Sequence, residues 1–143
     1  MSCKDNDKYQ QDSNCVCDIV KFIDDIQKAY DDFIGCPTNC LNPVLGATHH
    51  HGMKPNTRVI SLYTKTGELF FGHFFDQKFC ETKSSEFFRV ESVEDCCAVL
   101  RVLDVDRKNL GVCEFEKTNQ SIVVDLNCFC GIACIEDTFI PGV

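Results

Sequence analysis

The apolar positions near the N-terminus of the chain follow a helical spacing. Steps of mostly three and four residues connect Val16, Ile19, Val20, Ile23, Ile26, Tyr30 and Phe33. This spacing predicts an amphipathic helix, which Ser13 or Asn14 can cap and Gly35 with Pro37 can end. We expect its apolar side to pack on the core of the same chain, and the alternative is a neighbouring subunit.

Farther along the chain, the pattern changes to the short runs and two-residue alternation that are typical of β-strands. After an irregular stretch over residues 36–57, we expect strands at 58–64, 68–75, 87–93, 96–103, 112–117 and 121–130. The connections between them are short, and the sequence shows no second helix and no internal repeat. The expected fold is mainly β: an antiparallel sandwich or partly closed barrel with one N-terminal amphipathic helix.

The chain divides into two unequal parts. Residues 1–14 contain a single strongly apolar side chain, Tyr9, and we expect a flexible N-terminal arm that carries Cys3. Residues 15–143 are of a suitable size and apolar content for one cysteine-rich β-domain with its N-terminal helix.

Cysteine content is the abnormal feature of the composition. Twelve cysteines in 143 residues lie near the density of a disulfide scaffold, yet the polar start of the chain has no pattern of a secretory signal. No apolar run approaches the roughly 20 residues that span a bilayer. Thiols that begin in a reducing cytosol either bind metal or become oxidised later. A protein that assembles inside a cell which subsequently lyses would meet the second condition.

The charge of the chain argues against two classes of partner. The formal net charge is −8 and the isoelectric point is near 4.8, so acidic groups outnumber the lysines and arginines that a nucleic acid or an anionic membrane would require. We therefore expect neither nucleic acid nor membrane as a ligand.

Strand alternation divides the cysteines into two groups. The expected parity places four with the apolar side chains of their strands, facing the core: Cys96, Cys128, Cys130 and Cys134. Of Cys15 and Cys17, which are about 200° apart on a helix, one should face inward and the other outward. The candidates for disulfides and cross-links are Cys3, Cys15, Cys17, Cys36, Cys40, Cys80 and Cys97.

A phenylalanine-rich stretch places large apolar groups on both faces of one expected strand. It contains the interface candidates Phe70, Phe71, Phe74 and Phe75. A core needs only one of these faces, so the other face is a candidate contact with a second chain. A strand that is buried on both sides within one subunit is the alternative.

Two chemical functions compete with this structural interpretation, zinc binding and thiol catalysis. A zinc-ligand spacing is weakly present in Cys36 with Cys40, Cys130 with Cys134, and the run His49–His51, but the chain has no pair of Cys-x2-Cys knuckles. The competing function is therefore that of a zinc-binding adaptor protein. A thiol nucleophile would need a base and an orienting group. His73 and Cys80 are the nearest approach to such a pair, and the chain has no phosphate-binding or hydrolase motif. We therefore expect that the chain is not an enzyme and that it binds neither a cofactor nor a metal.

Several segments of the chain resemble one known family in the same order. They are NCVCD at 14–18, CPTNC at 36–40, FFRVE at 87–91, CCAVL at 96–100, EKTN at 116–119 and VDLNCFCGIAC at 124–134. Together they are similar to the CotY/CotZ/ExsY family of bacterial spore coat and exosporium proteins. Residues 56–58 and 62–67 resemble the exosporium-type members.

The resemblance implies a structural protein of the spore surface, in the exosporium basal layer or the coat crust. It implies synthesis in the mother-cell cytoplasm without a signal peptide and self-assembly into hexameric two-dimensional arrays. Disulfide cross-links then convert these arrays into a protective permeability barrier. The implied partners are other copies of the chain and other coat or exosporium proteins. The chain departs from relatives in its His49–His51 run and its phenylalanine-rich strand.

Overall fold

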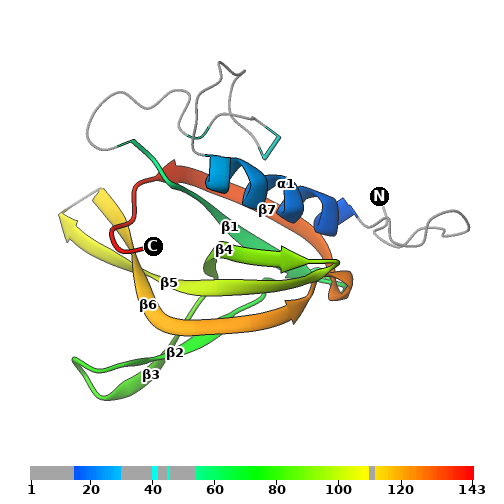
Figure 1. The fold of residues 1–143 in the computed structure, drawn as a ribbon. Helices are drawn as coiled ribbons and strands as arrows, with labels where there is room; N and C mark the ends of the chain where they lie inside the picture. The colour runs from blue at the N-terminus through cyan, green and yellow to red at the C-terminus, as the bar shows by residue number, and fades with distance from the viewer. Residues whose placement is uncertain (1–14, 30–39, 42–44, 46–53, 110–111) are drawn as a thin grey trace, which may run out of the picture.

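The computed structural model describes residues 15–29, 40–41, 45, 54–109 and 112–143 (Figure 1). These residues form one α-helix, α1 (Cys15–Ala29), and a series of strands: β1 (Thr57–Thr64), β2 (Gly72–Asp76), β3 (Glu81–Ser85), β4 (Phe87–Glu94), β5 (Cys97–Asn109), β6 (Val112–Asp125) and β7 (Phe129–Thr138). A short 3-10 turn, η1 (Leu126–Cys128), precedes β7. The expected arm over residues 1–14 lies outside the described residues.

Five strands form one antiparallel sheet in the order β6-β5-β4-β1-β7, and β2 pairs with β3 in a separate hairpin. The larger sheet ends at β6 and β7, so it is not closed into a barrel. Helix α1 packs against β4, β7 and β1, whereas the hairpin contacts β5 and β6 at the other side of the molecule (Figure 1). The predicted fold, mainly β and antiparallel with one N-terminal helix, is confirmed and is sandwich-like.

Helix α1 forms where the apolar spacing predicts it, and it buries the predicted side. Val16, Val20 and Ile23 are inaccessible to solvent or nearly so, and they join the main core cluster. Asp18 in the first turn and Lys28 in the last turn have the charges that the helix dipole favours. The predicted continuation of the helix toward Gly35 lies outside the described residues.

The central strands are buried on both faces of the large sheet. Because neighbouring residues on a strand point in opposite directions, they contribute to two separate clusters. One face joins the main core through Ile60, Leu62, Phe88, Val90, Leu100 and Val102. The opposite face forms a smaller cluster of Val59, Leu103 and Ile140, against which Phe87 and Phe115 pack. Ile140 reaches this cluster from the C-terminal segment, so the end of the chain covers the second face of the sheet.

The strand boundaries differ from the sequence prediction in several places. Strand β2 begins at Gly72 instead of residue 68, β5 continues to Asn109 instead of ending at residue 103, and β7 extends to Thr138, beyond the expected end at residue 130. Strand β3, with the sequence Glu-Thr-Lys-Ser-Ser, lacks the apolar alternation that would predict it. The two strands expected at 112–117 and 121–130 are one long strand, β6, up to Asp125. The chain then turns through η1, where the Asp125 side chain accepts a hydrogen bond from the backbone N–H of Asn127 at 2.9 Å.

The described part of the chain holds no helix of membrane-spanning length and hydrophobicity, and α1 itself has 15 residues.

Candidate functional site

Two disulfides lie within the described domain and fasten its peripheral parts to the sheet. Cys17 on α1 is bonded to Cys96, which precedes β5, across 79 positions of sequence. Cys40 is bonded to Cys134 on β7, across 94 positions. Both bonds therefore join segments that are distant along the chain. Cys17 and Cys40 are thereby removed from the candidates for bonds between chains.

A second group of cysteines is exposed and forms no disulfide. It consists of Cys80 in the β2–β3 turn, Cys97 at the start of β5, Cys113 on β6 and Cys128 in η1. Cys15 is also exposed at the start of α1, while its neighbour Cys17 is buried. The domain therefore has some sulfur atoms in internal bonds and others on its surface.

The parity argument places three of the four predicted core-facing cysteines against the core. Cys96, Cys130 and Cys134 are half-buried and pack on the main cluster, and the Cys130 thiol lies 3.1 Å from the Thr64 carbonyl oxygen. The prediction is wrong for Cys128, which is exposed. The cause is η1, because a 3-10 turn does not preserve the two-residue alternation of a strand.

The candidates Cys3, Cys36 and His49–His51 lie outside the described residues. Among the residues that the structure describes, no group of three or more His, Cys, Asp or Glu side chains could hold a metal ion. Cys113 is absent from the predicted cross-link positions. Its alternation with Phe115 along the strand is the signal that would have placed it on an aromatic face.

The phenylalanine-rich segment divides between the core and the surface. Phe74 is buried, and the Phe70 ring is stacked on Phe88 at 5.6 Å between centroids and meets the edge of Phe129 at 5.0 Å. Phe70 and Phe74 therefore pack on the main core, and their role at an interface stays a prediction. Phe71 and Phe75 remain 44% and 55% exposed on the other face.

The β2–β3 hairpin continues the exposed apolar surface to its tip. Phe79, in the turn, is 65% exposed, which is more than either Phe71 or Phe75. Lys83 lies 4.9 Å above the centre of the Phe79 ring and 2.7 Å from the Asp76 carboxylate. The Lys83 hydrogen bond is the main reason that the pKa of Asp76 lies below its ordinary value. These contacts hold an aromatic ring at an exposed tip.

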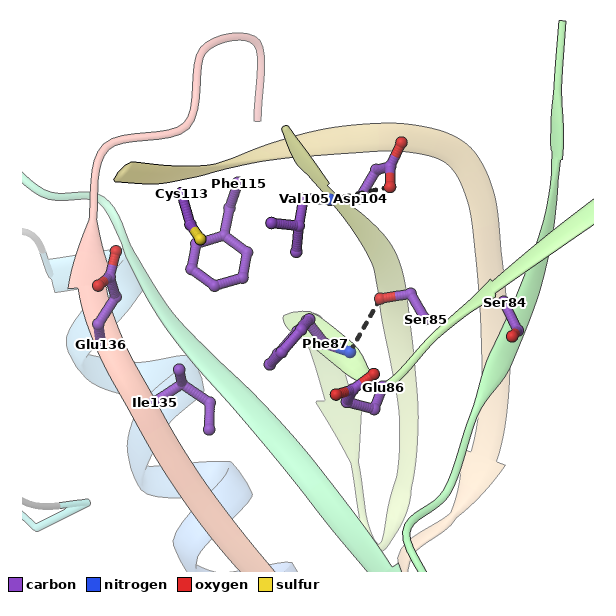
Figure 2. Close-up of a pocket in the computed structure, with 10 residues that line it drawn as sticks. All are labelled: Ser84, Ser85, Glu86, Phe87, Asp104, Val105, Cys113, Phe115, Ile135 and Glu136. Atoms are coloured by element: carbon purple, nitrogen blue, oxygen red, sulfur yellow. Dashed lines mark hydrogen bonds between the residues drawn. The ribbon is translucent and has the colours of Figure 1, made fainter. Parts of the chain in front are cut away.

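A groove with a volume of 640 Å³ opens between the two edge strands of the large sheet. Cys113 and Phe115 on β6 face Ile135 and Glu136 on β7 across it (Figure 2). Phe87 lies between them, with its ring 5.1 Å from Phe115 in an edge-to-face contact. The remaining lining residues come from β3, β5 and the approach to β4: Ser84, Ser85, Glu86, Asp104 and Val105.

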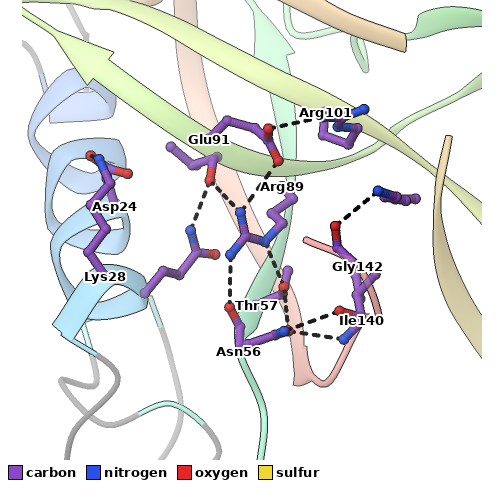
Figure 3. A network of polar contacts seen from close by, with 12 residues as sticks. Asp24, Lys28, Asn56, Thr57, Arg89, Glu91, Arg101, Ile140 and Gly142 are labelled. Carbon is purple, nitrogen blue, oxygen red and sulfur yellow. Dashed lines mark hydrogen bonds and ion pairs between the residues drawn. The ribbon is translucent and has the colours of Figure 1, made fainter. Parts of the chain in front are cut away.

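A network of polar side chains connects strands of the large sheet with the C-terminal segment (Figure 3). Arg89 donates to Thr57 Oγ1 at 2.8 Å and to the Asn56 carbonyl at 3.2 Å, and it pairs with Glu91. Burial lowers the pKa of Arg89, and Glu91 opposes that shift. Asn56 in turn exchanges two hydrogen bonds with the backbone of Ile140. The contacts of Arg89 with Thr57 and Asn56 join β4 to β1 and the residue before it, and those of Asn56 with Ile140 join that residue to the C-terminal segment.

The fold and its surface define a class of protein: a mainly β domain, fastened internally by disulfides, with thiols and aromatic rings on its outside. Comparisons with known proteins give the particular family. The family model described as Spore coat protein Z matches residues 1–112. Spore coat protein Z of Bacillus subtilis (strain 168) is 34% identical over 146 residues, covering 92% of this chain and 95% of that protein. No solved structure matches the chain.

The chain therefore belongs to the Spore coat protein Z family. The resemblance to CotY and CotZ proteins in the sequence motifs is confirmed. Membership supports a structural role in the spore coat and a location at the spore surface.

The Cys17–Cys96 bond should contribute measurably to the stability of the domain. In the variant C17A/C96A, the free energy of unfolding should fall by about 2–4 kcal/mol, because a disulfide that closes a long loop restricts the unfolded chain. Urea unfolding followed by circular dichroism measures this change, and replacing the exposed Cys97 by serine is the matched control. Equal stability of C17A/C96A and the wild type would contradict this role.

Proposed function

We propose that this protein is a building block of the outer spore layers, the exosporium basal layer or the coat crust. Copies assemble into hexameric units that tile a two-dimensional array, and disulfides then cross-link the array into a protective permeability barrier. The chain acts as a structural component and not as an enzyme. Its partners are other copies of itself and other coat or exosporium proteins.

The division of the cysteines is the observation that carries this proposal. Two internal bonds stabilise each domain, while Cys80, Cys97, Cys113 and Cys128 present thiols on separate elements of the surface. A domain that needed sulfur only for its own stability would have no use for exposed thiols, which are reactive. Thiols in several directions suit a unit that is bonded to several neighbours.

The order of events follows from the chemistry of the two environments. The chain is made in the reducing mother-cell cytoplasm, where non-covalent packing of apolar surfaces sets the geometry. After the mother cell lyses, two facing thiols lose two electrons and two protons to dissolved oxygen, which becomes hydrogen peroxide, and one sulfur–sulfur bond forms. Each bond raises the effective concentration of neighbouring contacts, so many moderate links make a layer that is hard to dismantle.

The exposed aromatic side chains suit the non-covalent step. Phe71, Phe75 and Phe79 are all more than two-fifths exposed and lie on or beside one hairpin. A cluster of this kind on a small domain is typical of a contact surface between proteins.

The nearest approach to a catalytic pair in the sequence, His73 with Cys80, does not carry an enzymatic function in this proposal. Both residues are exposed, and the Cys80 thiol contacts the Gln77 carbonyl oxygen at 3.9 Å instead of a base.

Negative-stain electron microscopy of the untagged recombinant protein tests the assembly. We expect planar arrays built from six-membered rings once the protein is concentrated and reductant is removed. A chain that remains a dispersed monomer at high concentration under oxidising conditions would overturn the proposal.

A further inference from the structure

The tip of the β2–β3 hairpin carries three adjacent groups of different chemistry. Lys78 supplies a positive charge, Phe79 an aromatic ring that is 65% exposed, and Cys80 an exposed thiol. Among the described residues Lys78 makes no ion pair, and the nearby Asp76 carboxylate pairs with Lys83. The tip thus offers a charge, a ring and a thiol to a partner.

The backbone at Cys80 shows that the hairpin does not need a cysteine at this position. Its φ is 52°, in the left-handed region, where a residue with a Cβ atom is disfavoured and glycine is not. Backbone strain of this kind is found at functional positions. It also means that Cys80→Gly removes the thiol while leaving the turn in a conformation that glycine adopts readily.

The groove between β6 and β7 offers the complement of each group at the tip. Phe87, Phe115 and Val105 supply an apolar wall, and Cys113 is an exposed thiol on the same side of β6 as Phe115 (Figure 2). The charged residues of the lining are Glu86, Asp104 and Glu136, with no lysine or arginine among them. Its volume of 640 Å³ is within the range of cavities that receive small ligands or a few side chains.

The groove cannot receive the tip of its own hairpin without breaking β3. Ser84 and Ser85, at the end of β3, form part of the groove lining, whereas Cys80 precedes the start of the same strand. Five residues of extended chain separate Cys80 from Ser85, which is about 16 Å. With β3 paired to β2 along its length, we take the tip that enters this groove to come from another chain.

We infer that the groove of one copy binds the β2–β3 hairpin tip of a second copy, and that Cys80 of the tip then forms a disulfide with Cys113 in the groove. Phe79 packs against Phe87 and Phe115, and Lys78 lies near the groove carboxylates. Dissolved oxygen accepts two electrons and two protons from the two thiols and becomes hydrogen peroxide as the sulfur–sulfur bond forms. This inference rests on the self-assembly proposed above and assigns one of its contacts.

Mass spectrometry of an isotopically mixed assembly identifies the bond directly. Unlabelled and ¹⁵N-labelled chains are mixed under reducing conditions, assembled, oxidised in air and digested without reduction. We expect a peptide pair that joins Cys80 to Cys113, with many pairs containing one labelled and one unlabelled partner. Pairs without mixed labels would place the bond within one chain and overturn the inference.

Three variants test the contact, and mass spectrometry after digestion without reduction follows the Cys80–Cys113 peptide pair in each. C80G and C113S should each abolish this peptide pair, whereas the control C97S, which removes another exposed thiol, should retain it. F79A should slow formation of the Cys80–Cys113 bond roughly tenfold or more, the loss expected for an interfacial aromatic anchor. Circular dichroism checks that each variant is folded. An unchanged rate in F79A would show that the ring does not guide the contact, contrary to the inference.

The outcomes also separate this inference from the proposed function. Arrays that form and become cross-linked without a Cys80–Cys113 bond would overturn the inference and leave the proposed function standing. A chain that neither assembles nor forms bonds between copies would overturn both.

Discussion

Removal of four exposed thiols is expected to leave the assembled layers with few covalent links. In the variant C80G/C97S/C113S/C128S, assemblies should dissolve mainly to monomers in boiling detergent, whereas wild-type assemblies should remain too large to enter a gel. The reason is that non-covalent contacts do not survive hot detergent, while a network of many disulfides does. Electrophoresis without reductant, with densitometry of the monomer band, measures the difference.

The matched control for this experiment is C17A/C96A, which removes one internal disulfide and leaves the four exposed thiols in place. Its assemblies should keep their resistance to detergent. If the four-thiol variant stayed as large as the wild type until reductant was added, the lattice bonds would lie at other cysteines.

Loss of the Arg58 side chain should have the largest effect on the stability of the single domain. Arg58 is only 2% exposed, and its guanidinium donates to both carboxylate oxygens of Asp137, at 2.8 and 2.9 Å, and to the Cys40 carbonyl at 3.0 Å. The variant R58A leaves the half-buried Asp137 charge without this partner. Breaking a buried pair in this way costs about 3–5 kcal/mol, which corresponds to a melting temperature lower by roughly 10–20 °C.

Thermal unfolding of R58A measures this loss, and a second variant shows its cause. In R58M/D137L both charges are replaced by apolar side chains, so no carboxylate is left without its partner and much of the lost stability should return. Both measurements belong in the four-thiol variant, where bonds between chains do not interfere. If the double variant were as unstable as R58A, lost packing and hydrogen bonds to the loop would explain the effect.

The sequence predicts the elements that depend on local periodicity. The spacing of Val16, Val20 and Ile23 predicts both the existence of α1 and the face that it buries. The alternation of Ala98, Leu100 and Val102 likewise predicts the inward side of β5 and the outward position of Cys97. In each case burial follows directly from the geometry of a single element.

The features that the sequence does not predict depend on contacts between distant segments. Strand β3 is polar and forms because β2 pairs with it. The exposure of Cys128 follows from η1, which breaks the alternation between two strands that lie at opposite edges of the sheet. The groove and the position of Cys113 beside it require those two edges to approach each other. Disulfide partners 79 and 94 positions apart are equally beyond local pattern.

The most direct test of the account uses wild-type protein that is assembled under reducing conditions, oxidised in air, and boiled in detergent with and without a reductant. Electron microscopy of the two samples should show intact sheets in the sample without reductant and none in the sample with it. Sheets that survive equally in both samples would contradict the claim that disulfides make the assembly resistant to detergent. Oxidised protein that never forms sheets would contradict the account of self-assembly itself.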